Sequence, residues 1–249
     1  MAGLVECSGV SIRFKARGAW TEALAPTELR LAPGSFTALI GPSGCGKSTL
    51  LNAIAGFVQP AAGGVAVDGA QVTGPSPEVG VVFQQYALFP WFTARGNVEF
   101  ALRRLRLPRA ERRAEADAAL AEVGLHGRGD AFPAQLSGGM KQRVALARTL
   151  AARPKVLLMD EPFGALDAQT RASMHELLLG VWERRRTTVL FVTHDVDEAL
   201  TLADRIHVMA SGPGRIIETI ELGDRATRDG PAYMDHRRRI IALLRHREE

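Results

Sequence analysis

The segment Gly41–Thr49, GPSGCGKST, constrains the fold more than any other part of this 249-residue chain. It fits the pattern G-x-x-x-x-G-K-[ST], which is informative only between a strand and a helix. The apolar run Phe36–Ile40 before it predicts a strand, and the stretch Thr49–Ala55 after it predicts a helix. We therefore expect a loop whose backbone N–H groups converge on phosphate oxygens at a helix N-terminus.

The residue types in this loop suit a nucleoside triphosphate, ATP, with Mg²⁺. Glycines let the backbone adopt turns that other residues disfavour. Lys47 supplies a charged donor to the phosphates, and the Ser48 hydroxyl is a candidate Mg²⁺ ligand. Cys45 is interpreted as a small filler residue, because no histidine lies near it in sequence. The candidate nucleotide-binding residues are Gly41, Pro42, Ser43, Gly44, Cys45, Gly46, Lys47, Ser48 and Thr49.

Two acidic residues occur at the end of the apolar run VLLMD, Val156–Asp160. A run without alternation is typical of a strand buried on both faces. Carboxylates at the C-terminal end of such a strand lie near the ligand crevice of an open α/β sheet. Asp160 is therefore a candidate Mg²⁺ partner, directly or through water, and Glu161 a candidate general base that polarises the attacking water.

Two more polar residues stand where predicted strands end. His194 follows the run FVT and is a candidate γ-phosphate contact beside Asp160 and Glu161; a local hydrogen bond at a helix N-terminus is the alternative. Gln84 follows VGVVF, and its neutral amide could coordinate Mg²⁺ or water; a polar strand-exit residue is the alternative. The predicted catalytic residues are thus Glu161, His194 and Gln84, and the predicted metal ligands are Ser48, Gln84 and Asp160.

The order of the predicted elements indicates an α/β fold with a mostly parallel sheet flanked by helices. The front third reads as strands, at Leu4–Phe14, Ser35–Ile40, Gly63–Asp68 and Gly80–Phe83. Helical spacing covers Thr93–Val123, and another helix is expected at Gly138–Ala152, before Pro154. Strands are then expected at Val156–Asp160, Thr188–Thr193 and Arg205–Met209, and helices at Thr170–Arg185, Asp195–Ala203 and Pro231–Arg247.

The segment Leu136–Arg143, LSGGMKQR, is not explained by a single nucleotide site. Ser137 can cap the following helix, while Gly138 and Gly139 leave backbone N–H groups bare at its start. This makes a second anion site without a base or a metal ligand. We interpret it as a recognition element.

With this segment the chain resembles the ATP-binding-cassette ATPases. The matching motifs occur in order over nearly the whole chain: GPSGCGKST, VVFQ with Gln84, LSGG, VLLMDEP, Ala165-Leu166-Asp167 and His194. The combination of LSGG, the phosphate loop and DEP is highly specific. Met140 departs from the commonest pattern, in which glutamine follows LSGG, and we do not interpret it as a loss of activity.

The resemblance implies a head-to-tail homodimer that encloses two ATP molecules. The signature of one subunit, Leu136, Ser137, Gly138, Gly139 and Met140, would close over ATP on the phosphate loop of the other. It also implies that Asp167 lies at the dimer seam and that Phe14 stacks on adenine. The implied fold is a P-loop NTPase with a RecA-like, mostly parallel core, an N-terminal antiparallel β portion and an inserted α-helical subdomain.

The resemblance further implies a single domain over residues 1–249. Residues 1–84 and 154–222 would form the nucleotide-binding core, 85–153 the helical subdomain with LSGG, and 223–249 a helical tail. The implied partners are a second copy of the chain, two transmembrane permease subunits and, indirectly, an extracytoplasmic solute-binding protein. Tyr86, Leu88, Phe89 and Trp91 would be exposed in a groove that receives a permease helix, and a place in the core is the alternative.

The stretches GPSPEVGVVFQ, LFPW and SGPGRIIETIEL resemble importers of nitrate, sulfonate and taurine. Another small solute, such as a pyrimidine precursor, remains an alternative. A soluble ATPase of the same family that acts on nucleic acid is disfavoured, because the chain has no coiled-coil insertion and no second cassette. A small-molecule kinase is disfavoured because no acceptor site is evident.

Composition adds bounds on location and partners. No apolar run reaches the ~18 residues of a membrane span, and the N-terminus lacks a secretory signal. We therefore expect a peripheral protein at the cytoplasmic face of the inner membrane.

Arginines cluster at Arg103–Arg113, Arg184–Arg186 and Arg237–Arg239. Such stretches can bind nucleic acid or anionic membrane, but interleaved acids and few aromatics favour solvated helix faces, so no nucleic-acid partner is expected.

Overall fold

The computed structural model describes residues 2–16, 18–223 and 231–245. The strands are β1 (Val5–Ala16), β2 (Ala19–Leu31), β3 (Phe36–Ile40), β4 (Ala62–Val67), β5 (Ala70–Gln71), β6 (Val79–Val82), β7 (Val156–Asp160), β8 (Thr188–Thr193), β9 (Arg205–Ala210) and β10 (Arg215–Glu221). The helices are α1 (Lys47–Ile54), α2 (Ala94–Leu102), α3 (Arg109–Glu122), α4 (Gly138–Ala151), α5 (Ala168–Arg185), α6 (Val196–Leu202) and α7 (Pro231–Arg245), with 3₁₀ turns at Arg103–Leu105 and Pro133–Gln135.

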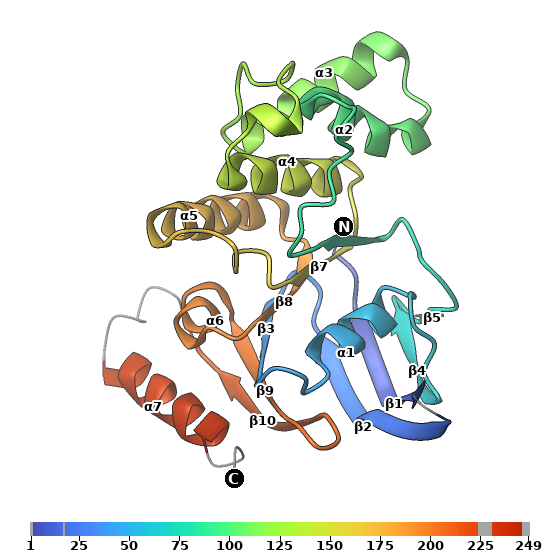
Figure 1. Cartoon of the computed structure of the whole chain (residues 1–249), viewed down its shortest axis with the longest axis vertical. Coiled ribbons are helices and arrows are strands. Elements are labelled where there is room, and N and C mark those ends of the chain that lie inside the picture. The colour runs from blue at the N-terminus through green and yellow to red at the C-terminus, as the bar shows by residue number, and fades with distance from the viewer. Residues whose placement is uncertain (1, 17, 224–230, 246–249) are drawn as a thin grey trace.

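These strands form two sheets (Figure 1). The larger has the order β10-β9-β3-β8-β7-β6 and is parallel except for the pair β9–β10. The smaller has the order β2-β1-β4-β5 and is antiparallel throughout. The predicted mostly parallel core and N-terminal antiparallel portion are therefore confirmed.

The central strands of the large sheet separate two hydrophobic cores. In β8, Val189 and Phe191 belong to one core, and Leu190 and Val192 belong to the other. This alternation explains why the strand sequence has no polar face: each face of the sheet is covered. The helix α1 packs between the two sheets and contacts β1, β2, β4, β7 and β8. Its N-terminus is thereby fixed at the end of β3.

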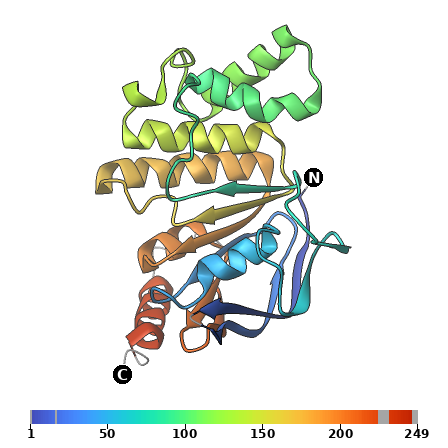
Figure 2. The same ribbon diagram turned by 45° about the vertical axis from the view of Figure 1, so that its right-hand side comes forward.

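The other face of the large sheet is covered by helices. The views show α4 and α5 side by side above the sheet, with α2 and α3 beyond α4 (Figure 2). The helices α2, α3 and α4 contact one another, which is the arrangement expected of a helical subdomain. Its boundaries at residues 85 and 153 stay a prediction.

Several elements differ from the sequence predictions, among them the short strand β5, which was not predicted. The helical stretch 93–123 is divided, because Pro108 cannot continue a helix and stands directly before α3. The strand β2 was not predicted, because Pro26 interrupts its sequence; β2 is an edge strand, where proline is tolerated. The strand β10 was also missed. The tail helix is described to Arg245, so the rest of the predicted range Pro231–Arg247 lies outside the described residues.

The tail helix α7 is attached to the core by apolar and charged contacts. Ile240 is fully buried, and the Arg237 guanidinium donates to Asp197 at 2.7 Å. Arg239 forms an ion pair with Glu218 on β10. In the part of the chain that the structure describes, no helix has both the length and the apolarity needed to cross a membrane.

His207 on β9 makes the stability of the fold depend on pH. Its side chain is 6% exposed, and burial, with a smaller contribution from Arg205, lowers its pKa to about 4. In the unfolded chain histidine titrates near 6.5, so between these values the unfolded state binds more protons. The free energy of unfolding should therefore fall by up to about 3 kcal/mol as pH falls from about 6.5 to 4. Urea titrations across this window should show a smaller slope of stability against pH for His207→Gln than for the wild type, and equal slopes would contradict the assignment.

Candidate nucleotide and catalytic site

The phosphate loop joins β3 to α1, and buried side chains pack closely against its backbone. Lys47 is 5% exposed, and its Nζ donates to the carbonyls of Gly41 at 2.8 Å and Pro42 at 2.9 Å. A Cβ on Gly41 would lie 2.6 Å from Cys45 Sγ and 2.7 Å from Met209 O, so only glycine fits there. Cys45 is fully buried, and burial raises the pKa of its thiol, which agrees with its interpretation as a filler.

The turn before β10 supports the same loop, and the sequence did not reveal this role. Gly214 exchanges backbone hydrogen bonds with β2, donating to Ala23 O at 3.1 Å and accepting from Ala25 N at 2.8 Å. A Cβ on Gly214 would lie 2.2 Å from Cys45 O. The glycine therefore allows the turn to lie directly against the phosphate loop.

Replacement of Gly214 by alanine should displace the phosphate loop. The added Cβ would clash with the backbone oxygen of Cys45, which cannot move aside as a flexible side chain can. Overpacking of this kind costs about 1–3 kcal/mol of stability. We expect Gly214→Ala to weaken ATP binding about tenfold, measured by calorimetry. Gly74→Ala is the matched control, because a Cβ there meets no atom within 4 Å; equal affinities for the two variants would contradict this account.

Ser48 and Asp160 lie together at the ends of α1 and β7. The Ser48 Oγ donates to Asp160 Oδ1 at 2.9 Å. Burial raises the pKa of Asp160, and the Glu161 carboxylate adds repulsion. A divalent cation would relieve both effects, and hydroxyl and carboxylate oxygens are the ligands that Mg²⁺ prefers. The residues present therefore fit a magnesium ion.

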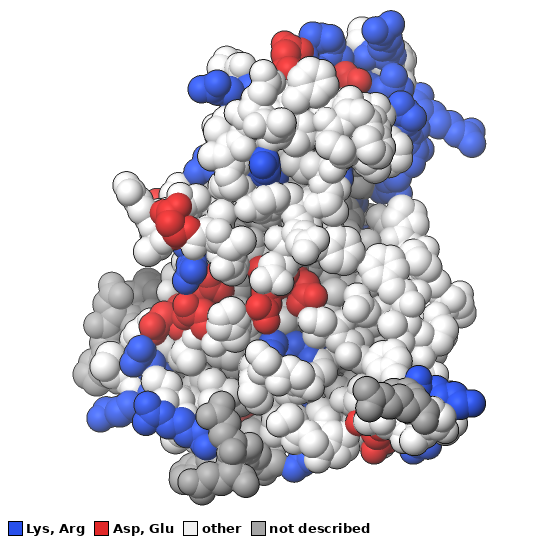
Figure 3. All heavy atoms as spheres, viewed as in Figure 1, with Lys and Arg blue, Asp and Glu red and all other residues white. Residues whose placement is uncertain are grey.

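Glu161 and His194 form the next pair along the sheet edge. The ring Nδ1 of His194 lies 3.0 Å from Glu161 Oε2. Glu161 has φ of 44°, and its N–H donates to Val192 O at 2.9 Å. A non-glycine residue in the left-handed region costs of order 1–3 kcal/mol and is often found at functional sites. Acidic side chains gather across the middle of this face, below the helical layer and over the region of α6, β3 and β8 (Figures 1 and 3).

Gln84 lies against the segment that follows Glu161. Its Nε2 comes within 3.2 Å of the Cβ position of Gly164. It also lines a mostly apolar cavity of about 670 Å³, here called the docking groove, whose walls include Tyr86, Leu88, Pro133, Ala134 and Ala165. Gln84 and Ala165 thus connect the groove to the segment that follows Glu161. Of the aromatic positions predicted to be exposed, Trp91 is exposed, while Tyr86 and Phe89 are only partly so.

The signature segment begins α4 as predicted. Ser137 Oγ accepts from Met140 N at 3.3 Å, and Leu136 is buried. A Cβ on Gly138 would lie 2.9 Å from Tyr86 Oη, and one on Gly139 would lie 2.5 Å from Thr170 Cγ2. The glycines therefore serve packing as well as backbone exposure.

A cavity of about 440 Å³ opens in front of the signature. Its described lining includes Ser137, Gly139, His126, Arg128 and Arg143, and no residue of the phosphate loop. Within the described residues, this cavity therefore does not bring the signature and the phosphate loop together. The basic side chains around it suit an anion, and these flanking positions were not predicted from the sequence.

Asp167 caps α5, and its carboxylate accepts from Thr170 N at 2.9 Å and Thr170 Oγ1 at 2.7 Å. These hydrogen bonds lower the pKa of Asp167.

Arg171 lies one turn after Asp167 on α5. Its guanidinium donates to Leu166 O at 3.1 Å and lies 3.5 Å from the carboxylate of Asp195, the residue after His194. Arg171 thus links the two segments that carry Asp167 and His194. The sequence did not single it out, because its partners come from separate segments.

The remaining predicted residue, Phe14, lies on β1 in the small sheet, paired with Thr21 of β2. Its ring is 45% exposed, so it is available for stacking.

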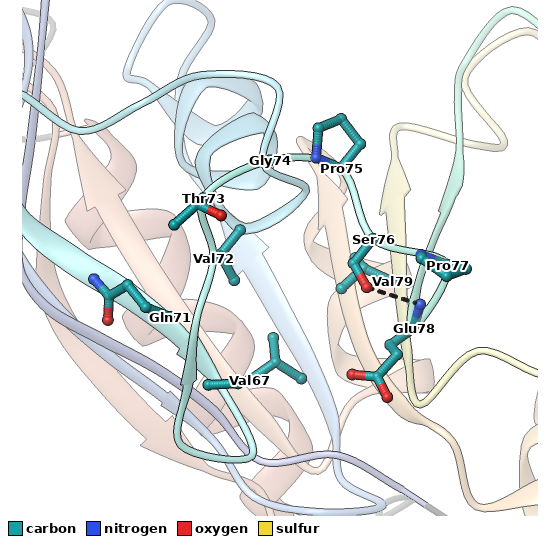
Figure 4. Close-up of a pocket in the computed structure, with 11 residues that line it drawn as sticks. Val67, Gln71, Val72, Thr73, Gly74, Pro75, Ser76, Pro77, Glu78 and Val79 are labelled. Carbon is teal, nitrogen blue, oxygen red and sulfur yellow. Dashed lines mark hydrogen bonds between the residues drawn. The ribbon is translucent and has the colours of Figure 1, made fainter.

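A separate cavity of about 280 Å³ lies along residues 67–79 (Figure 4). Ser76 accepts there from Glu78 N at 3.2 Å, and none of the predicted site residues lines it. We therefore assign it no part in nucleotide chemistry.

Comparison with known proteins agrees with this geometry. The sequence pattern of the ABC transporter family matches residues 24–164. The taurine import ATP-binding protein TauB of Pseudomonas putida is 48% identical over 251 residues, covering 97% of this chain and 95% of that protein. A putative ATP-binding protein of Brucella abortus is 51% identical, covering 91% of this chain and 89% of its own.

Among solved structures, the ATP-binding cassette MJ0796, a dimer bound to ADP and Pi, matches with a TM-score of 0.79. The two are 33% identical over 88% of this chain and 99% of that one. The chain belongs to the ABC transporter family, as an ATP-binding and ATP-hydrolysing cassette. The predictions of family, fold and ATPase activity are confirmed, while the roles assigned to individual residues stay predictions.

Proposed function

We propose that the chain is the ATPase subunit of an importer for taurine, a related sulfonate, nitrate or a similar small anion. The identity with taurine import proteins over nearly the full chain supports this substrate class. The permease and the extracytoplasmic binding protein would select the solute. The chain would work at the cytoplasmic face of the membrane, held there by the two permease subunits.

In the proposed reaction, the loop N–H groups and Lys47 hold the phosphates of ATP. Ser48, Asp160 and Gln84 would hold Mg²⁺, which neutralises charge on the phosphates. Glu161 accepts a proton from the attacking water, and its backbone position next to β8 fixes the carboxylate. His194 orients Glu161 from one side and contacts the γ-phosphate from the other.

A second copy would complete the site. The signature faces a cavity that contains no phosphate-loop residue, so its bare N–H groups need an anion from outside the chain. We assign that anion to the ATP held by the partner, with Asp167 at the seam. The dimeric state of the MJ0796 cassette supports this arrangement.

The observation that carries the transport function is the position of Gln84 and Ala165. Both line the docking groove, and Gln84 also lies close to Gly164 in the segment after Glu161. A permease helix in the groove would therefore bear directly on the catalytic edge. ATP binding would shift the subunits to the closed state through contacts made only there.

Co-purification tests the groove. Ala134 is an exposed alanine in the groove wall, and Ala61 is an exposed alanine in the bend before β4, outside the groove lining. With the permease genes co-expressed, Ala134→Glu should abolish recovery of the complex from detergent extracts, since a buried unpaired charge is costly. Ala61→Glu should be recovered like the wild type. Both variants should keep the ATPase activity of the isolated chain, and equal recovery of the two would contradict the proposal.

Uptake assays in a deletion strain test the substrate class. Strains carrying the wild-type chain should take up labelled taurine, alkanesulfonates or nitrate, and strains carrying Glu161→Gln should not. Uptake of a pyrimidine precursor alone would overturn the proposed class and leave the transport function standing.

A further inference from the structure

In two of the arginine clusters of the sequence, most of the side chains have acidic or aromatic partners in the fold. On α7, Arg237 pairs with Asp197, Arg238 with Asp235 at 2.6 Å, and Arg239 with Glu218. At the end of α5, Arg185 pairs with Glu122 at 2.9 Å, and Arg186 lies 4.5 Å from the centre of the Trp182 ring. These two clusters therefore serve the packing of their own helices.

The third cluster has no ion pair with a described acidic side chain. It comprises the arginines between α2 and the second turn of α3, here called the arginine patch: Arg103, Arg104, Arg106, Arg109, Arg112 and Arg113. Among the described residues, none of the six has an acidic side chain within 4.0 Å. The only acid in the same eleven-residue stretch is Glu111. Five of the six are exposed and Arg112 is half-buried, so the charge is presented to the surroundings.

The patch occupies one end of the helical layer. Figure 3 shows basic side chains gathered over the end of α2 and α3, apart from the acidic band at the middle of the molecule. An aromatic surface lies next to it: Arg103 stacks on Phe100 at 5.3 Å, and Phe100 is 42% exposed. Exposed aromatic rings beside cationic side chains are typical of surfaces that contact a membrane interface.

The patch is also continuous with the docking groove. A cavity of about 430 Å³ is lined by Phe89, Phe100, Arg104 and Ala87. Ala87 also lines the docking groove, and Arg104 belongs to the patch. A permease helix in the groove would therefore bring the surface of the bilayer to the side of the molecule that carries the patch.

We propose that the arginine patch binds the anionic phospholipid headgroups of the membrane beside the permease. Guanidinium groups match phosphate oxygens in bidentate geometry. Arg113 interacts electrostatically with Asp130, but no patch arginine forms an ion pair with a described acidic side chain, so the guanidinium groups are free to bind phosphate. The orientation towards the bilayer rests on the proposed permease docking, whereas the affinity for anionic lipid is a property of the chain alone. The patch would hold the subunit at the membrane while the groove loosens during turnover.

Sedimentation of the full chain with vesicles tests the proposal. Binding should occur with vesicles of phosphatidylcholine and phosphatidylglycerol in equal parts, be absent with phosphatidylcholine alone, and weaken with salt. Each arginine near an anionic surface contributes about fivefold to binding. The triple variant Arg106→Gln, Arg109→Gln, Arg113→Gln should thus bind about 100-fold more weakly.

The matched control removes the same charge elsewhere. Arg30, Arg184 and Arg238 are exposed on β2, α5 and α7, and their triple glutamine variant should keep most of the vesicle binding. An equal loss in both variants, or no binding by the wild type, would overturn the proposal. Tight binding of a duplex oligonucleotide that the patch variant loses, without vesicle binding, would also overturn it in favour of nucleic acid. Each of these failures would leave co-purification with the permease untouched, so it is distinguishable from failure of the proposed function.

Discussion

Glu161→Gln should lower ATP turnover by about 100-fold to 10,000-fold, the range supplied by a positioned general base. Glutamine has the shape of glutamate and can keep the contact with His194, which lies 3.0 Å from the carboxylate. ATP binding should therefore survive while proton acceptance is lost. The variant should accumulate as an ATP-bound dimer with twice the 26.9 kDa mass of the chain.

Light scattering with ATP and Mg²⁺, together with a phosphate-release assay, checks this result. Glu183→Gln is the matched control, because Glu183 is exposed on α5, and it should turn over like the wild type. A Glu161→Gln chain that remains monomeric with ATP bound would count against the proposed closed dimer.

Lys47→Ala should weaken ATP binding by about 100-fold or more. The Lys47 ammonium is buried in the loop and held by two carbonyls. A hydrogen bond to a charged group contributes about 1.5–3 kcal/mol, and the ammonium can make two such bonds to phosphate oxygens. Calorimetric titration with ATP measures the loss.

Lys155→Ala is the control for Lys47, because it removes the same charge from a distant ion pair with Asp68 and Glu78. Its ATP affinity should be unchanged, although its stability should fall slightly. If both lysine variants bound ATP like the wild type, the phosphate loop would not be the nucleotide site.

The parts of this molecule that the sequence predicted are those with a local physical signature. The run Val156–Asp160 is apolar because both faces of its strand are covered, and this pattern is visible without a structure. The phosphate loop is equally visible, because glycine spacing, lysine and serine must stand in one order to bind phosphate.

The parts that the sequence did not predict depend on contacts between distant segments. Nothing near Gly214 indicates that its backbone lies against Cys45, and nothing near Arg171 indicates its link from Leu166 to Asp195. Likewise, the arginine clusters look alike in sequence. Only the fold shows that two have acidic or aromatic partners and that the arginine patch has no acidic partner among the described residues.

The central claim is that each ATP site combines the phosphate loop of one chain with the signature of another. Mixing two inactive variants tests it most directly: Lys47→Ala, with a defective loop, and Ser137→Arg, with a defective signature. A mixed dimer contains one site in which both halves are intact, so the mixture should regain ATP hydrolysis that neither variant has alone. A chain carrying both substitutions, mixed with either single variant, should stay inactive. A mixture of the single variants as inactive as its components would contradict the shared site.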